Sequence, residues 1–441
     1  MIKLSDHFDY KRLLRFTAPS IGMLIFMSIY SVVDGFFVSN FVGTIPFAAI
    51  NFVMPALMLM NFIGFLFGTG GGALIAKTIG EGNRVKANQI FSMLVYLSFF
   101  LGILFAIFGI IYIGEVAKIL GATGEFLEQS ITYGQIALLA LPMSILQCEF
   151  QCLASTAEKP KLGFYVTVAT GLTNIFLDAL FIITFGWGIE GAAIATAVSE
   201  AIGGILPLIY FSRENSSLLR LTKTKFDGRA LIQTCSNGIS ELLSSISMSI
   251  IGMLYNWQLL KYAGSDGVAA FGILIYAAFI FEAIFIGYSM GVSPIISFNY
   301  GAKNYSELKN VFKKSLFLIG AFAVIMFISA ESLARPIAKI FVESDAKLLE
   351  MTVHAFRICS FAFLIEGFTM FISSFFTALN NGFISALISG LRTLVFEVGA
   401  VLIFPIIWGL DGVWFSMVGA EIMSVILSVI MLLIYRRRYN Y

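Results

Sequence analysis

The sequence predicts an all-α membrane protein built from two six-helix halves, and three observations support this. Of its 441 residues, 59% are hydrophobic and 12% are charged, with a mean hydropathy of +0.91, which leaves too little polar surface to cover a soluble domain. Twelve segments reach the length of about 20 residues that a spanning helix needs. A shift of 221 residues superimposes the second half of the chain on the first without a gap. Such a repeat in an apolar chain is typical of transporters, whose two bundles enclose a site near the bilayer midplane.

The spans follow one another in the same order in both halves. In the first half they are 13–40, 46–76, 90–114, 130–156, 162–186 and 191–211, and in the second 235–260, 266–298, 311–334, 350–378, 383–407 and 412–435. Because six is an even number, both halves enter the membrane from the same side, about an axis along the membrane normal. The expected division is a first lobe at 1–215, a linker at 216–234 and a second lobe at 235–441.

Matching residues support the repeat as well as matching lengths. The shift places the first residue of each of the following pairs on the second: Trp187 and Trp408, Gly188 and Gly409, Gly191 and Gly412, Glu200 and Glu421, Gly70 and Gly291, Gly80 and Gly301. We therefore expect the function to lie between the two halves.

Basic residues predict the orientation. Most Lys and Arg lie in the N-terminal stretch, in the loops around 77–86, 159–161 and 303–314, in the stretch 213–229 and at the last residues, all on one side of the expected twelve spans. The positive-inside rule places these loops and both termini in the cytoplasm. The basic linker could also be a nucleic-acid or lipid patch, but a solvated linker that obeys the topology rule explains its charge better, and no nucleic-acid partner is expected.

Other motifs carry little information. The four cysteines lie in apolar segments and predict neither disulfides nor a thiolate metal site. Residues 68–73 match a dinucleotide-binding pattern loosely, but close helix packing explains these glycines better inside an apolar helix. No Walker lysine motif, HExxH pair or GxSxG elbow is present, so no enzyme and no cofactor are expected. A membrane-embedded protease or acyltransferase would need a catalytic constellation that the two histidines, His7 and His354, scarcely allow.

Two acids inside predicted spans are the sharpest functional candidates. An ionisable group in a membrane helix costs roughly 2.5 to 3.5 kcal/mol on insertion scales, so Asp34 and Asp178 need a reason to be there. Tyr30 lies one turn before Asp34 on the same helix face, and Asn174 one turn before Asp178. Two carboxylates close together in a low dielectric do not both ionise cheaply, which suits one of them to carry a proton. The same oxygens, with Asn174 and the Thr196 hydroxyl, could instead hold Na+, and a helix-packing hydrogen bond is the alternative for either acid alone.

The second half does not repeat this pair. The shift maps Asp34 onto Tyr255 and Asp178 onto Gly399, so the coupling site is expected in the first half only. Arg392 and Glu397 could pair with each other, and their roles and that of Glu366 stay open. The residues that we assign to a substrate cavity are Glu241, Glu282, Met54 and Asn256.

Together, these features resemble the multidrug and toxic compound extrusion (MATE) transporters over nearly the whole chain. The matching stretches are Asp34 in the first helix, Asn174-x-x-x-Asp178 in the fifth, Ala18-Pro19-Ser20, Gly80-Glu81-Gly82-Asn83, Trp187 to Ala193, Ser293-Pro294 and Asn299 to Ala302. Ser240 to Leu243 and Phe376 to Gly382 look like a MepA-like bacterial subgroup.

The resemblance implies a fold, a location and a site. The fold would be a V-shaped pair of bundles that acts as a monomer in the plasma (inner) membrane of a bacterium. Family members of the DinF-like branch place a cation site in the first lobe, and its residues match Asp34, Asn174, Asp178, Thr196, Tyr30 and Tyr133. A fourth-helix Asn of that site is Gln151 here, which keeps the amide on a longer arm. Pro19 would be a hinge in the first helix.

The resemblance also implies export of small organic, often cationic or amphipathic, compounds in exchange for H+ or Na+. The runner-up is a lipid-linked oligosaccharide or lipid flippase of the same wider superfamily. A flippase should offer more cationic side chains to hold a pyrophosphate, whereas Arg357 and Arg392 are the only basic residues well within the predicted spans.

Overall fold

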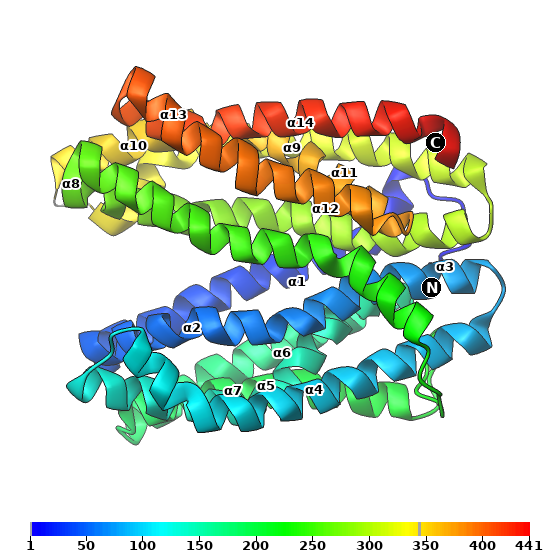
Figure 1. Cartoon of the computed structure of the whole chain (residues 1–441), viewed down its shortest axis with the longest axis horizontal. Coiled ribbons are helices and arrows are strands. Elements are labelled where there is room, and N and C mark those ends of the chain that lie inside the picture. The colour runs from blue at the N-terminus through cyan, green and yellow to red at the C-terminus, as the bar shows by residue number, and fades with distance from the viewer. Residues whose placement is uncertain (1, 343–344) are drawn as a thin grey trace.

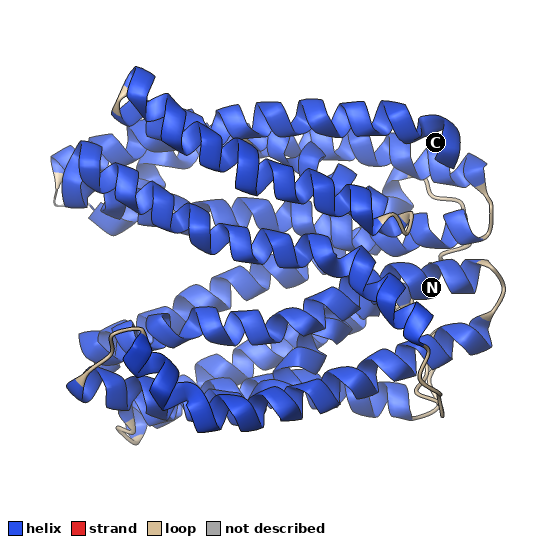
Figure 2. Cartoon of the chain, in the orientation of Figure 1, coloured by secondary structure: helices blue, strands red, loops and turns tan. Residues whose placement is uncertain are grey.

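A computed structural model describes residues 2–342 and 345–441, and within them it contains helices joined by short loops and no strand (Figure 2). The helices are α1 (Tyr10–Phe37), α2 (Thr44–Phe65), α3 (Gly72–Gly80), α4 (Arg84–Ile119), α5 (Gly124–Thr156), α6 (Pro160–Asp178), α7 (Gly188–Ser212), α8 (Gly228–Gly301), α9 (Tyr305–Val342), α10 (Ala346–Ser360), α11 (Phe363–Ala378), α12 (Gly382–Gly390), α13 (Val398–Trp408) and α14 (Leu410–Tyr439). The all-helical membrane fold predicted from the sequence is thus confirmed.

Several helices are interrupted by wider π-helical turns. These are η1 (Val38–Val42), η2 (Leu66–Gly71), η3 (Ala179–Thr184) and η4 (Leu391–Glu397). Turns of this kind appear frequently at functional sites. Here η1 begins four residues after Asp34, and η3 follows directly after Asp178.

Ten helical stretches of the described residues are long and apolar enough to cross a membrane, and α10 and α11, which meet at a bend of 49°, form an eleventh when counted as one span. The long helix α8 is broken at Gly264, whose φ of 65° and ψ of −150° are not helical. Glycine adopts this backbone conformation without the steric penalty that a Cβ would bring. Counted as separate spans, the two arms of α8 would bring the total to the expected twelve.

Side-chain caps fix where several helices begin. Asp9 accepts the Arg12 N–H before α1, and Asn83 accepts the Lys86 N–H before α4. Asp227 accepts the N–H groups of Arg229 and Ala230 at the start of α8. Each cap satisfies an N–H that has no partner inside its helix. The helices therefore start where short polar residues precede the apolar runs.

The helices form two bundles, α1 to α7 below and α8 to α14 above in Figure 1, which lie close together on the side of the termini and diverge toward the other side. The largest apolar cluster fills the second bundle, and two smaller clusters fill the first. Glycines allow the close approach between bundles. A Cβ on Gly80 would overlap the Phe298 carbonyl oxygen, and one on its repeat partner Gly301 would overlap the Lys77 carbonyl oxygen.

The first residues of the chain cross from one bundle to the other. Leu4 and Phe8 are fully buried and belong to the apolar cluster of the second bundle. The Leu4 N–H donates to Glu158 in the α5–α6 loop at 2.6 Å, whereas the Phe8 N–H donates to Glu307 of α9 at 2.8 Å. We call residues 2–9 the N-terminal strap. The strap belongs by sequence to the first predicted lobe but packs largely on the second.

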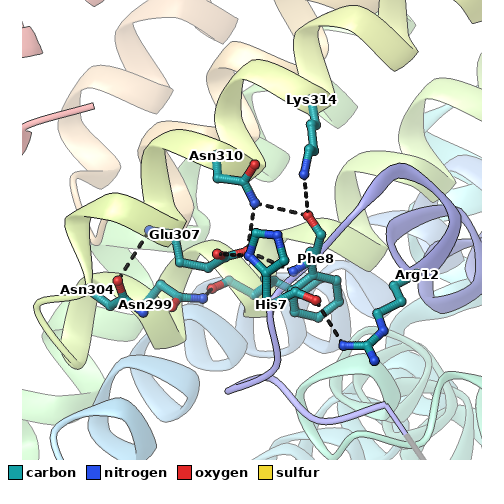
Figure 3. A network of polar contacts seen from close by, with 9 residues as sticks. His7, Phe8, Arg12, Asn299, Asn304, Glu307, Asn310 and Lys314 are labelled. Atoms are coloured by element: carbon teal, nitrogen blue, oxygen red, sulfur yellow. Dashed lines mark hydrogen bonds and ion pairs between the residues drawn. The ribbon is translucent and has the colours of Figure 1, made fainter.

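Three side chains of α9 hold the strap at its second anchor (Figure 3). The carboxylate of Glu307 lies 2.7 Å from His7 Nδ1. Asn310 and Lys314 both donate to the Phe8 carbonyl oxygen, at 2.9 and 2.7 Å. Asn310 also donates to Glu307 at 2.9 Å. The strap is therefore tied by backbone and side-chain hydrogen bonds as well as by apolar packing.

Candidate cation site in the first bundle

The predicted coupling residues come from four helices of the first bundle. Asp34 lies in α1, Asn174 and Asp178 in the last turns of α6, and Thr196 in α7. Tyr133 lies in α5. Pro160 at the first position of α6 suits a helix start, because its missing N–H is not needed there. The α1–α6 and α6–α7 contacts bring these elements together.

The structure brings Asp34, Asn174 and Asp178 next to one another. Asp178 is 0% exposed and Asn174 is 3% exposed. Among the described residues, both carboxylate oxygens of Asp178, one of Asp34 and the Asn174 amide oxygen are buried without a hydrogen-bond partner. Buried oxygens of this kind are costly unless something satisfies them. A proton or a hard cation such as Na+ would do so.

The two predicted tyrosines border this group. Tyr133 is 1% exposed, and its hydroxyl lies beside Thr196 and within electrostatic range of Asp34. Tyr30 lies one turn before Asp34 in α1 and packs against Gly171 of α6. A Cβ on Gly171 would come within 2.8 Å of the Tyr30 ring, so glycine permits α1 and α6 to approach closely here.

Gln151 makes a different contact. Its amide donates to the Thr167 hydroxyl at 3.1 Å, and both side chains are buried. Gln151 also lines a cavity of about 10 Å³ between α5, α6 and α7, scarcely enough for one water molecule. The longer amide arm is thus used in helix packing, and its part in cation binding stays a prediction.

The four residues assigned to a substrate cavity lie in different surroundings. Glu241 and Asn256 are exposed, whereas Met54 is half-buried and packs against an apolar cluster of the first bundle. Glu282 is half-buried and lies within electrostatic range of Arg392. Pro19 lies inside α1 as expected, and its hinge role stays a prediction.

One predicted pairing is wrong. Arg392 does not pair with Glu397, but donates from Nε to Glu421 at 2.6 Å and from a terminal nitrogen to Glu366 at 3.3 Å. The sequence suggested Glu397 because it is close along the chain, whereas the residues that bond Arg392 come from other helices. The actual partners are Glu421 of α14 and Glu366 of α11. Helix α14 packs against η4, which holds Arg392, and α11 packs against the preceding α12.

Sequence reasoning also passed over two acids of the first bundle. Glu149 in α5 is 0% exposed, and neither of its carboxylate oxygens has a hydrogen-bond partner among the described residues. Glu200 in α7 lies one turn after Thr196 and within electrostatic range of Asp34. The same four-residue spacing that linked Asn174 to Asp178 could have linked Thr196 to Glu200.

Comparisons with known proteins agree with this architecture. The MatE family model matches residues 19–180 and 242–403, one segment in each half. The chain is 27% identical over 437 residues to the multidrug export protein MepA of Staphylococcus haemolyticus, covering 97% of this chain and 94% of that protein. It is 24% identical over 430 residues to MepA of Staphylococcus aureus strain MRSA252, with the same coverage of both chains.

Solved structures share the fold. A MATE crystal structure in complex with MaL6 superimposes with a TM-score of 0.92 at 23% identity, covering 98% of this chain and 97% of that one. An outward-facing multidrug resistance MATE transporter gives a TM-score of 0.91 at 23% identity with the same coverage. Because the family model matches nearly three quarters of the sequence, in two segments that repeat the internal symmetry, the chain belongs to the MatE family.

Proposed function

We propose that this protein is a secondary active antiporter that exports small organic compounds, often cationic or amphipathic, in exchange for H+ or Na+. The observation that carries the proposal is the group of buried oxygens of Asp34, Asn174 and Asp178, which have no hydrogen-bond partner among the described residues and lie in a bundle whose basic residues are all near the ends of its spans. The relatives named multidrug export proteins support the class of cargo. The protein would act as a monomer in a bacterial plasma membrane, with both termini in the cytoplasm.

The mechanism would use alternating access. Binding of the coupling cation at Asp34 and Asp178 removes the cost of their buried charge, so it stabilises whichever arrangement of α1 and α6 closes around it. Drug binding favours the other arrangement. The cation and the drug therefore shift the equilibrium between the two arrangements in opposite directions. Pro19 would permit α1 to change its bend between the two arrangements.

The flippase is a weaker candidate for a structural reason. Its pyrophosphate cargo would need free cationic groups. The Arg392 side chain is 19% exposed and already bonded to two carboxylates, and Arg357 lies 3.9 Å from Glu331. Neither arginine is therefore held ready for a phosphate, which favours cationic cargo.

Ethidium efflux from proteoliposomes tests the proposal. We expect efflux under an imposed pH gradient or an imposed Na+ gradient, none without a gradient, and none in the Asp34→Asn/Asp178→Asn double variant. The gradient that drives efflux identifies the ion. Absence of gradient-driven efflux for ethidium, tetraphenylphosphonium and rhodamine 6G alike would refute the antiporter.

A further inference from the structure

Glu200 is a third carboxylate that faces the Asp34 group. It lies one helical turn after Thr196 in α7, so both side chains project from the same helix face. Asp34 acts on it electrostatically, and the Ser144 side chain of α5 lies beside it. Glu200 also lies within electrostatic range of Tyr30 of α1 and of Tyr133 and Cys148 of α5. All of these facing groups are neutral or acidic.

The internal repeat shows what Glu200 lacks. Its repeat partner Glu421 forms an ion pair with Arg392 at 2.6 Å. The same shift of 221 residues places Arg392 on Gly171. A Cβ on Gly171 would come within 2.6 Å of the Phe26 ring, so the first bundle has neither an arginine nor room for one at this position. The second bundle places an arginine against this glutamate, and the first bundle does not.

No other basic residue of the first bundle can supply the missing charge. Lys and Arg are absent from 16–76, 87–117, 124–158 and 162–212, which contain all of its predicted spans except residues 13–15. A carboxylate inside a membrane-spanning helix is costly without a counter-charge. A proton or a cation must therefore balance Glu200, just as one must balance Asp34 and Asp178.

Glu200 does not complete a single metal site with the two aspartates. Among the described residues, no three His, Cys, Asp or Glu side chains come close enough together to hold a metal ion. Glu200 is also partly accessible, whereas Asp178 is fully buried. Glu200 is therefore a separate binding group beside the aspartate pair. A single carboxylate with a neighbouring hydroxyl suits a proton better than a hard metal cation.

We propose that Glu200 is a second proton-carrying group of the first bundle, distinct from the Asp34–Asp178 pair, and that it moves one additional proton in each transport cycle. This inference rests on the proposed antiport function. The Glu200 carboxylate takes a proton from the outer solution and returns it to the cytoplasm as the cycle completes. With one proton on the aspartate pair, a monovalent cation would leave in exchange for two protons, and the cycle would move one net positive charge inward.

The test is the voltage dependence of exchange in proteoliposomes. Tetraphenylphosphonium transport, after subtraction of the flux across protein-free liposomes, is measured with the pH gradient held at zero while K+ and valinomycin set the membrane potential. We expect exchange by the parent protein to follow the potential, and exchange by Glu200→Gln to lose one proton per cation and become insensitive to it. The matched control is Glu190→Gln, an exposed acid of the same helix, which should behave as the parent does.

Two outcomes separate this inference from the proposed function. If the parent moves no organic cation under any gradient, the antiport proposal fails. If the parent couples cation export to protons and Glu200→Gln keeps the same proton count and voltage dependence, the inference about Glu200 is overturned and the antiport proposal stands. Transport driven by Na+ with no proton movement overturns it as well.

A binding measurement keeps the inference testable if Glu200→Gln does not accumulate in the membrane. Calorimetry of tetraphenylphosphonium binding in buffers of different ionisation enthalpy counts the protons released. The Asp34→Asn/Asp178→Asn variant should still release about one proton if Glu200 titrates separately. Release of none would show that the aspartate pair is the only proton site.

Discussion

Arg392 donates from Nε to the Glu421 carboxylate at 2.6 Å, and Glu421 is only 6% exposed. Removing one partner of a buried ion pair leaves the other charge without compensation, which typically costs about 3 to 5 kcal/mol. We therefore expect Arg392→Met to lower the free energy of unfolding by an amount in this range. Thermal unfolding of the purified protein in detergent measures the loss.

A second arginine provides the control for this prediction. The Arg357 side chain is 60% exposed and lies 3.9 Å from Glu331, so Arg357→Met should change stability by less than about 1 kcal/mol. The Arg392→Met/Glu421→Gln double variant should recover part of the loss because it leaves only Glu366, and no longer both acids, buried without the arginine. Equal destabilisation by both single arginine variants would contradict the assignment.

Asp34→Asn should abolish export while leaving the fold intact. The amide keeps the size of the side chain but removes the charge that the coupling cation is expected to neutralise. We expect at least a tenfold drop in gradient-driven ethidium efflux, equivalent to about 1.4 kcal/mol or more. Asp9→Asn, in the cap of the same helix, should export normally because Asn is an equally good cap. Normal export by Asp34→Asn with intact expression would exclude Asp34 from coupling.

The fold could be predicted almost completely from the sequence, because the spans follow from hydropathy and the pairing of halves from the repeat. The breaks inside spans were harder to predict. The bend between α10 and α11 carries no proline, and the π-helical turns depend on packing between helices. Gly264 lies where two predicted spans meet, and there the sequence and the structure agree.

The candidate site was predicted in part, for reasons of distance along the chain. Asn174 and Asp178 are linked by helical spacing alone, so their common face could be inferred. The partners of Arg392 lie 26 and 29 residues away on other helices, and no local pattern links them to it. The proposed role of Glu200 needed both its proximity to Asp34 and the comparison with Glu421, and only the structure shows what surrounds Glu200 and Glu421.

Glu307→Ala should release the N-terminal strap from the second bundle. The substitution removes the acceptor of the Phe8 N–H and of His7, at 2.8 and 2.7 Å. Leaving a buried N–H without a partner costs about 1 to 3 kcal/mol. We expect faster amide hydrogen exchange at Phe8 and earlier proteolytic cleavage within residues 2–9. Glu81→Ala, an exposed acid after α3, is the control, and unchanged protection of Phe8 in Glu307→Ala would show that apolar packing alone holds the strap.

The other anchor of the strap predicts a pH dependence. Burial raises the pKa of Glu158 above its ordinary value, and the Leu4 N–H and the Lys3 charge only partly oppose this effect. The folded protein therefore holds this proton more tightly than the unfolded chain does. As pH rises above the ordinary carboxyl pKa, ionisation favours the unfolded chain, and the loss of stability is complete above the folded pKa.

Glu158→Gln should remove that dependence. The amide oxygen can still accept the Leu4 N–H, but it does not ionise. We expect the melting temperature of the parent, measured relative to Glu158→Gln, to be lower at pH 8 than at pH 4. A difference that is constant across this range, or that runs the other way, would show that the carboxylate is not penalised by burial.

Gly80→Ala and Gly301→Ala should weaken the contact between bundles on the side of the termini. A Cβ at either position meets a backbone carbonyl oxygen of the other bundle, which cannot rotate away as a side chain would, and overpacking of this kind typically costs about 1 to 3 kcal/mol. Gly252→Ala, in the first arm of α8, meets nothing within 4 Å and should be neutral or stabilising by up to about 1 kcal/mol. If alternating access opens this contact in each cycle, the two alanine variants should also shift the protein toward the arrangement in which the bundles part on this side. Cysteine accessibility at Lys77→Cys measures that shift, and lower accessibility in the alanine variants than in the parent would contradict it.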